Sequence, residues 1–79
     1  MDDIDPRRRA FGAQLRALRA RSGQTQVQAA AAVGIYPTHF SEIERGNSNV
    51  TLDNILKLAD HFRVTPASLL EPCLLYTSD

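Results

Sequence analysis

The amino-acid sequence predicts an all-α fold, a compact bundle of five helices without strands. Apolar residues recur three and four positions apart, which is the period of an amphipathic helix and not that of a strand. Five positions also carry a helix-start signal, which is a capping side chain, a proline in the first turn, or both. These positions are Asp5, Thr25, Tyr36, Thr51 and Thr65. The connections are short and polar, as in one small domain.

The first helix is expected to begin behind Asp5, because aspartate is a good N-cap and Pro6 suits the first helical position. Its apolar residues have the spacing i, i+4 and i+7, and they are Phe11, Leu15 and Leu18. The pair Ser22-Gly23 is expected to end this helix, since glycine is common just beyond a helix C-terminus.

The second helix is expected to start at Thr25, because Thr25 and Gln28 match the capping-box pattern. It should run to about Val33 and stop at Gly34, a residue that tolerates a positive φ. Its sequence is rich in alanine, which favours helix formation but buries little apolar area. Small side chains are suited to a place where another helix must come close.

The third helix is expected over residues 36–45. A residue before proline is disfavoured in the α region, so Tyr36 suits the cap and Pro37 the first turn, while Gly46 ends the helix. At about 100° per residue, one face is apolar and carries Tyr36, Phe40 and Ile43. The opposite face carries Thr38, Glu42 and Arg45, with His39 and Ser41 on its flanks.

Two more helices complete the prediction. Thr51 is expected to cap the fourth helix. The buried stripe of that helix is expected to be Leu52, Ile55, Leu58, Ala59 and Phe62. Thr65-Pro66 repeats the combination of a cap and a proline, and it opens a short fifth helix with the apolar residues Leu69 and Leu70.

The formal net charge is zero, but the positive charge is concentrated in the first 45 residues, which hold seven of the nine cations. Between positions 7 and 45 there are seven arginines and two glutamates, a distribution that suits a polyanion, although a solvated charged helix has the same pattern. The single cysteine excludes an internal disulfide, and no membrane span or signal peptide is evident. We therefore expect a cytoplasmic protein without a membrane partner.

The second and third predicted helices have the layout of a helix-turn-helix, because only a few residues around Gly34 separate them. Ala29, Ala30 and Val33 would let the third helix pack tightly across the second, so that its polar face projects from the surface. Such a helix fits the major groove of DNA. An ordinary helical hairpin in a small bundle has the same spacing, and the spacing alone leaves both interpretations open.

The sequence contains the stretches FGAQLRALRARSGQTQ, VGIYPTHFSEIERG and TLDNILKLADHFRVTPASLL. With them the chain resembles the phage-repressor/Cro-like (XRE) helix-turn-helix family over roughly residues 10–71. The positions that match the spacing of the family are Arg19, Gln26, Ala30, Gly34 and the run Ile43-Glu44-Arg45-Gly46. The resemblance implies a lambda-repressor-like five-helix DNA-binding domain, usually a dimer in transcriptional control. Ala29 stands where the family usually has leucine, and Tyr36 stands where it often has serine or threonine.

Glu44 needs a partner, because it lies between Phe40 and Ile43 in projection and an unpaired buried charge is very costly. Arg19 flanks the apolar stripe of the first helix and is the best candidate. The resemblance implies the same pairing. We therefore predict a structural ion pair between Arg19 and Glu44, with no catalytic role.

The candidate DNA contacts divide by chemistry. The N-terminus of the second helix presents free N–H groups and the positive end of the helix dipole, which favour a phosphate. The predicted phosphate-contacting residues are Thr25, Gln26, Ser41, Arg45 and Asn47. The resemblance implies that the base-contacting residues are Pro37, Thr38, His39 and Glu42. Thr38 could bond a base edge or touch a thymine methyl group, and Glu42 could accept from a cytosine amino group. The alternative for each is a solvated surface residue.

These features predict a sequence-specific regulator of transcription, of repressor type, that binds a pseudo-palindromic double-stranded operator as a homodimer and needs no cofactor. The alternative is an antitoxin or a protein-interaction module with the same fold. An enzyme is not expected, because His39 and His61 lie on different helices and no metal-ligand spacing, phosphate loop or nucleophile motif is present.

The predicted domain spans residues 6–72, behind a lead of residues 1–5. The last seven residues, CLLYTSD, are what a transposon-end adaptor from sequencing libraries would encode. We therefore expect residues 73–79 to be a non-native tail. The alternative is a natural apolar tail that contributes to a dimer contact.

Overall fold

The computed structural model describes residues 5–76 of the 79-residue chain. Residues 1–4 of the expected lead and residues 77–79 of the expected tail lie outside the described residues. The described part consists of five α-helices and one 3-10 helix, and it has no strand. The elements are α1 (Pro6–Arg21), α2 (Gln26–Val33), α3 (Pro37–Arg45), α4 (Leu52–Phe62), α5 (Pro66–Leu70) and η1 (Glu71–Tyr76). The predicted all-α bundle of five helices is therefore confirmed.

All five predicted N-caps are found. The side chains of Asp5, Thr25, Thr51 and Thr65 each accept a hydrogen bond from a backbone N–H in the first turn of the following helix. The capping box of α2 is complete, since the Thr25 N–H also donates to the Gln28 side chain over 2.9 Å. Tyr36 caps α3 by its backbone conformation alone, without a side-chain hydrogen bond.

The helix ends were predicted less completely. Gly34 and Gly46 end α2 and α3 in the left-handed conformation, with φ values of 75° and 82°, as expected from glycine at these positions. Arg63 ends α4 in the same conformation, with φ 58°. It is the one non-glycine residue with positive φ among the described residues. The sequence carries no signal for this cap, because left-handed backbone is unfavourable for a residue with a Cβ atom.

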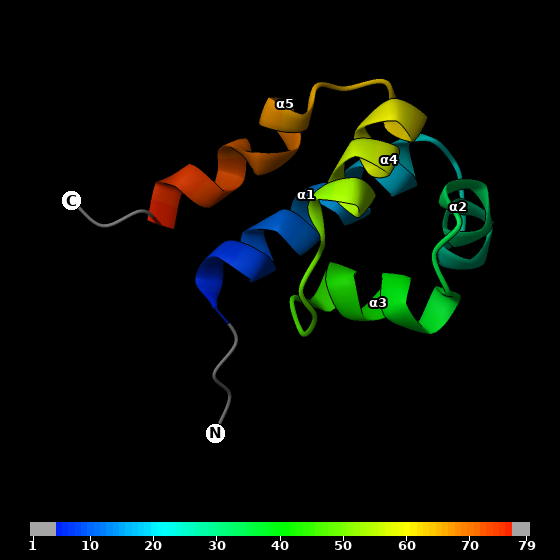
Figure 1. Cartoon of the computed structure of the whole chain (residues 1–79), viewed down its shortest axis with the longest axis horizontal. Helices are drawn as coiled ribbons and strands as arrows, with labels where there is room; N and C mark the ends of the chain where they lie inside the picture. The colour runs from blue at the N-terminus through cyan, green and yellow to red at the C-terminus, as the bar shows by residue number, and fades with distance from the viewer. Residues whose placement is uncertain (1–4, 77–79) are drawn as a thin grey trace.

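The core is formed by buried apolar residues from all five α-helices, and α2 closes one end of the bundle (Figure 1). Its largest fully buried side chains are Leu15, Phe40, Ile43, Leu58 and Leu69. Leu52 was predicted to join this core and does not, since 67% of it is exposed. It is the first residue of α4, and the apolar side of that helix toward the core is formed by later residues. Leu70, at the end of α5, is also exposed, at 39%.

A close crossing of α1 over α3 depends on Gly12, whose role was not predicted from the sequence. A Cβ atom at Gly12 would lie 2.2 Å from the Glu44 carbonyl oxygen and 2.6 Å from the Ile43 carbonyl oxygen. Only glycine therefore lets the two helix backbones approach so closely. The small residues Ala29 and Ala30 of α2 are fully buried, as the prediction of tight packing required.

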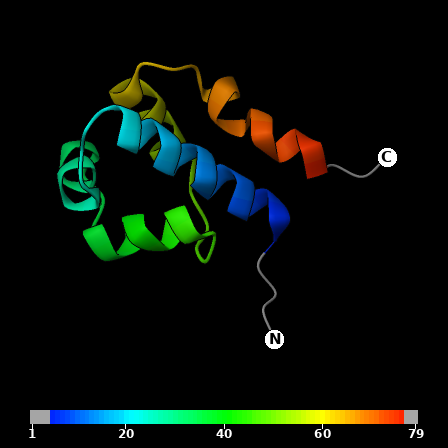
Figure 2. The ribbon, with the colours of Figure 1, turned by 180° about the vertical axis from the view of Figure 1, so that it is seen from behind.

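The C-terminal 3-10 helix η1 packs beside α1 (Figure 2). In this contact the Cys73 thiol donates to the Arg7 carbonyl oxygen over 3.3 Å, and burial raises the pKa of the thiol. Residues 73–76 of the expected tail thus belong to this helix, and their non-native origin stays a prediction. No helix within residues 5–76 has the length and hydropathy needed to cross a membrane.

Candidate nucleic-acid interface

The helix-turn-helix is formed by α2, the turn at residues 34–36, and α3. Gly34 reverses the chain, and the Ile35 N–H donates to the Ala30 carbonyl oxygen over 2.9 Å. The Ile35 side chain is buried beneath the turn. The two helices are therefore held by the backbone and by a buried side chain at their junction, which fixes how α3 projects from the molecule.

The two faces of α3 differ as the projection predicted, except at Tyr36. Phe40 and Ile43 are buried on the inner face, at 0% and 2% exposure. Tyr36 was predicted to share that face, but 84% of it is exposed. Its extended backbone, with φ −61° and ψ 139°, places it before the helix proper, where a helical projection does not apply.

The outer face and the flanks of α3 collect most of the predicted DNA contacts. Three residues on this helix are exposed and three are partly exposed. The exposed ones are Pro37, Thr38 and Arg45, and the partly exposed ones are His39, Ser41 and Glu42. Asn47 follows in the next loop and is also exposed.

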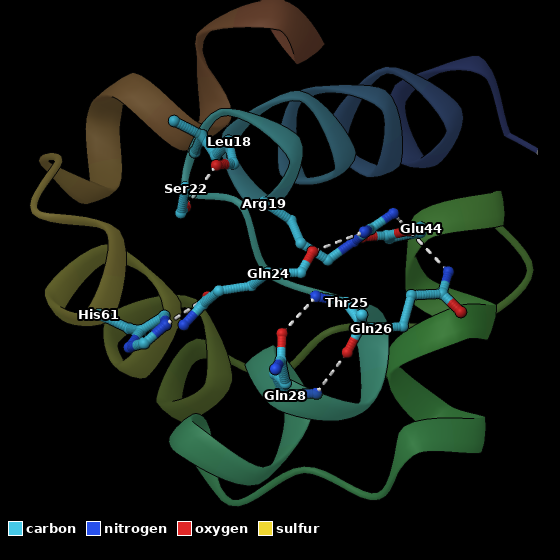
Figure 3. A network of polar contacts seen from close by, with 9 residues as sticks. All are labelled: Leu18, Arg19, Ser22, Gln24, Thr25, Gln26, Gln28, Glu44 and His61. Atoms are coloured by element: carbon cyan, nitrogen blue, oxygen red, sulfur yellow. Dashed lines mark hydrogen bonds and ion pairs between the residues drawn. The ribbon is translucent and has the colours of Figure 1, made fainter.

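The predicted ion pair anchors the inner face (Figure 3). Arg19 of α1 donates from Nε to Glu44 Oε2 over 2.6 Å and from Nη2 to Glu44 Oε1 over 3.1 Å. Only 2% of the Glu44 side chain and 15% of the Arg19 side chain are exposed. The hydrogen bonds to Glu44 raise the pKa of Arg19 above its ordinary value. The predicted pair is therefore confirmed. Its bidentate geometry fixes the relative orientation of α1 and α3.

Gln26 joins this anchor, which the sequence did not predict. Its Nε2 donates to Glu44 Oε1 over 2.8 Å, from the first residue of α2 (Figure 3). A glutamine amide has two N–H donors, so one of them stays available for a phosphate. The contact joins α2 to α3 through a buried carboxylate, across 18 residues of sequence.

The network continues from Arg19 to α4. Arg19 Nη1 donates to the Gln24 carbonyl oxygen over 3.0 Å, and the Gln24 side-chain oxygen lies 2.9 Å from His61 Nε2 (Figure 3). His61 was expected to be a partly exposed helix residue, and it is. Its partner could not be found from the sequence, because 37 residues separate the two. Within residues 5–76 no cluster of histidine, cysteine, aspartate or glutamate could hold a metal ion.

Two further contacts concern predicted DNA-binding residues. Arg45 Nη2 donates to Glu42 Oε2 over 2.9 Å on the outer face of α3. His39 Nε2 lies 3.4 Å from the Asn49 carbonyl oxygen in the following loop. Thr25 uses its N–H in the capping box, so it can offer a phosphate its hydroxyl donor but not that backbone group.

The sequence matches the model of a helix-turn-helix domain family over residues 10–71. The control protein C.BamHI of Bacillus amyloliquefaciens is 39% identical to this chain over 62 residues, which cover 77% of this chain and 76% of that protein.

Solved structures show the same likeness. The restriction-modification controller protein C.AhdI from Aeromonas hydrophila is 37% identical, with a TM-score of 0.79 and coverage of 82% of this chain and 98% of that one. The clp gene regulator ClgR from C. glutamicum is 29% identical, with a TM-score of 0.78 and coverage of 91% and 94%. The family match, the fold and the geometry of α2 and α3 agree, and this chain belongs to the phage-repressor/Cro-like (XRE) helix-turn-helix family of DNA-binding transcription regulators.

Proposed function

We propose that this protein is a cytoplasmic, repressor-type regulator that binds a pseudo-palindromic operator as a homodimer, with α3 in the major groove. The observation that carries the proposal is the outer face of α3. Thr38, Glu42 and Arg45 project there from a helix whose inner face is buried and tied to α1 by Glu44. A rigid helix with a polar, exposed face suits contact with base edges.

The roles proposed for single residues follow from their places on this surface. Pro37, Thr38, His39 and Glu42 would contact bases from the first two turns of α3. The backbone contacts would come from Thr25, Gln26, Ser41, Arg45 and Asn47. Gln26 suits a phosphate because it stands at the start of α2, where the helix dipole is positive, and because Glu44 already orients its amide.

The second copy in the homodimer would cover the exposed side of α4. Leu52 and Leu56 lie one turn apart on this helix and are 67% and 42% exposed. The charges nearby alternate in sign along the exposed side, as Asp53, Lys57, Asp60 and Arg63. Two α4 helices that run antiparallel around a two-fold axis would bury the leucines. They would also bring acidic residues of one copy next to basic residues of the other. The α3 helices of the two copies would then contact half-sites about 34 Å apart.

The biological setting that we propose follows from the relatives. One is named a control protein and another a restriction-modification controller protein. We propose the same type of role here, namely control of the genes of a restriction-modification system, without catalysis by this chain. The genes that neighbour this one would test that setting. No contact within residues 5–76 specifically favours the antitoxin or interaction-module alternative.

Selection from random double-stranded DNA tests the proposal. The expected result is an enriched motif with two-fold symmetry. Gel-shift affinity for that motif should fall by ~10³–10⁵ between 50 and 200 mM salt if about 6–10 phosphates are contacted. Selection that enriches no motif would contradict a specific regulator. Weak DNA binding whose affinity does not depend on salt concentration would support the interaction module.

Gln26→Ala separates backbone contacts from base contacts. This variant should weaken binding to all sequences by a similar factor, because a phosphate contact carries no direct sequence information. Glu71→Gln, an exposed change outside the helix-turn-helix, is the matched control and should bind as the parent does. A change in the selected motif on Gln26→Ala would contradict the phosphate role.

A further inference from the structure

We propose that Glu42 and Arg45 act as one unit on a single G·C base pair. In this unit Arg45 donates to the guanine and Glu42 accepts from the paired cytosine. The inference rests on the proposed placement of α3 in the major groove. It differs from the separate roles above, in which Glu42 contacts a base and Arg45 contacts only a phosphate.

The geometry that carries the inference is an exposed ion pair on the outer face of α3, at the C-terminal end of the helix. Arg45 Nη2 lies 2.9 Å from Glu42 Oε2, and the two residues are three positions apart on α3. Both side chains stay accessible, at 58% for Arg45 and 36% for Glu42. Thr38 precedes Glu42 by four residues, so the three side chains form one line along the helix. The pair therefore lies on the same face of α3 as the proposed base contact Thr38.

The pair keeps hydrogen-bonding capacity for a ligand. A guanidinium has five N–H donors, and a carboxylate has two acceptor oxygens. The bond between Nη2 and Oε2 uses one donor of Arg45 and one oxygen of Glu42. The other carboxylate oxygen, Oε1, has no hydrogen-bond partner within the described part of the chain. The unit thus presents several donors of Arg45 next to a free acceptor of Glu42, and the hydrogen bond between the two side chains holds them together.

This pattern is complementary to the major-groove edge of a G·C pair. That edge presents the acceptors N7 and O6 of guanine, followed by the N4 amino donor of cytosine. An A·T edge presents an acceptor, a donor and an acceptor in turn, so the adenine amino group would face a guanidinium donor. The fork of Arg45 matches N7 and O6, whereas a lysine at this position would supply one point charge.

Stability does not explain the pair, and its removal should leave the fold intact. Exposed ion pairs within a helix stabilise a protein only slightly. The anchor of α3 is the separate, buried contact between Arg19 and Glu44. Variants at positions 42 and 45 should therefore melt close to the parent, and changes in their DNA binding can be assigned to the interface.

The test is selection of binding sites for five proteins. They are the parent, Glu42→Gln, Arg45→Lys, the double variant of these two changes, and the control Arg16→Lys, an exposed change on α1. We expect Glu42→Gln and Arg45→Lys to relax the preference for G·C at the same operator position, by roughly 5- to 150-fold. The double variant should lose little more than either single variant, because the unit fails when one member is changed. Arg16→Lys should keep the preference of the parent.

A base analogue at that position makes the test sharper. Replacing its guanine by 7-deazaguanine removes the N7 acceptor, so it should weaken the parent and leave Arg45→Ala, which has no donor at this position, almost unaffected. The proposal is wrong if Arg45→Lys keeps the motif while Arg45→Ala lowers affinity for all sequences alike, since Arg45 is then a phosphate contact. It is also wrong if the two single variants alter different positions. In both cases a motif still exists and the proposed function stands. If the parent selects no motif, the proposed function fails as well.

Discussion

Removal of either partner of the Arg19–Glu44 ion pair should destabilise the protein even without DNA. Arg19→Ala leaves the Glu44 carboxylate, of which 2% is exposed, with the single donor Gln26. Breaking a buried pair in this way costs about 3–5 kcal/mol. Glu44→Ala should cost less, because Arg19 is 15% exposed and keeps its bond to the Gln24 carbonyl oxygen. A domain of this length has a free energy of unfolding of only about 4–12 kcal/mol, so Arg19→Ala removes a large part of it.

The assay is a thermal melt of the parent, both single variants and the double variant, all without DNA. A loss of ~3–5 kcal/mol corresponds to a fall in Tm of about 12–40 °C for a domain of this size. The double variant should lose less than the sum of the single variants, since it leaves no unpaired charge. If the single variants melt with the parent and fail only in DNA binding, the structural role is refuted and both residues belong to the contact surface.

Three further predictions concern the fold around this anchor. Gly12→Ala places a Cβ atom 2.2 Å from a backbone oxygen of Glu44. The free energy of unfolding, measured by urea denaturation, should therefore fall by ~1–3 kcal/mol or more. An unchanged urea midpoint would contradict the close crossing of α1 and α3. Arg63→Gly should raise the free energy of unfolding by about 1 kcal/mol, because glycine accepts the φ of 58° without strain, and a destabilised variant would count against that conformation. Hydrogen bonds from Arg7 lower the pKa of Asp5 from 3.8 to about 2. The N-cap of α1 should therefore be intact above pH ~4 and lost as the pH falls through 2. An NMR titration of the Arg7 amide would follow this loss. An Arg7 amide shift that moves near pH 4 would refute this last prediction.

The helix starts could be predicted because their signals are local. A cap side chain bonds to an N–H two or three residues away, and a proline restricts its own backbone, so a short stretch such as Thr25 to Gln28 contains all the information. The pair between Arg19 and Glu44 was also predictable, since burial of a charge requires a partner and Arg19 flanks the apolar stripe of α1. The same reasoning did not extend to Gln26, because a third, neutral partner is compatible with burial but not required by it.

The features that the sequence did not predict depend on contacts between distant segments or on an unfavourable backbone. Gly12 lies in the middle of a helix, where glycine has no turn to form, and its role is visible only once α3 crosses it. Arg63 occupies a conformation that its own propensity opposes. Tyr36 was misplaced because a helical projection was applied to a residue that precedes the helix. Leu52 is exposed although it has the spacing of the core residues, and an apolar stripe does not by itself say whether the core or a partner covers it.

The central claim is that the outer face of α3 contacts bases in the major groove while the N-terminus of α2 holds the backbone. An NMR titration of the ¹⁵N-labelled protein with its selected operator duplex tests this most directly. The account predicts that the largest amide shifts fall at residues 25–28 and 36–47, with NOEs from the Thr38 methyl group to major-groove base protons. Shifts that concentrate on α1 or α5 instead, or contacts to the sugar-phosphate backbone alone, would contradict it.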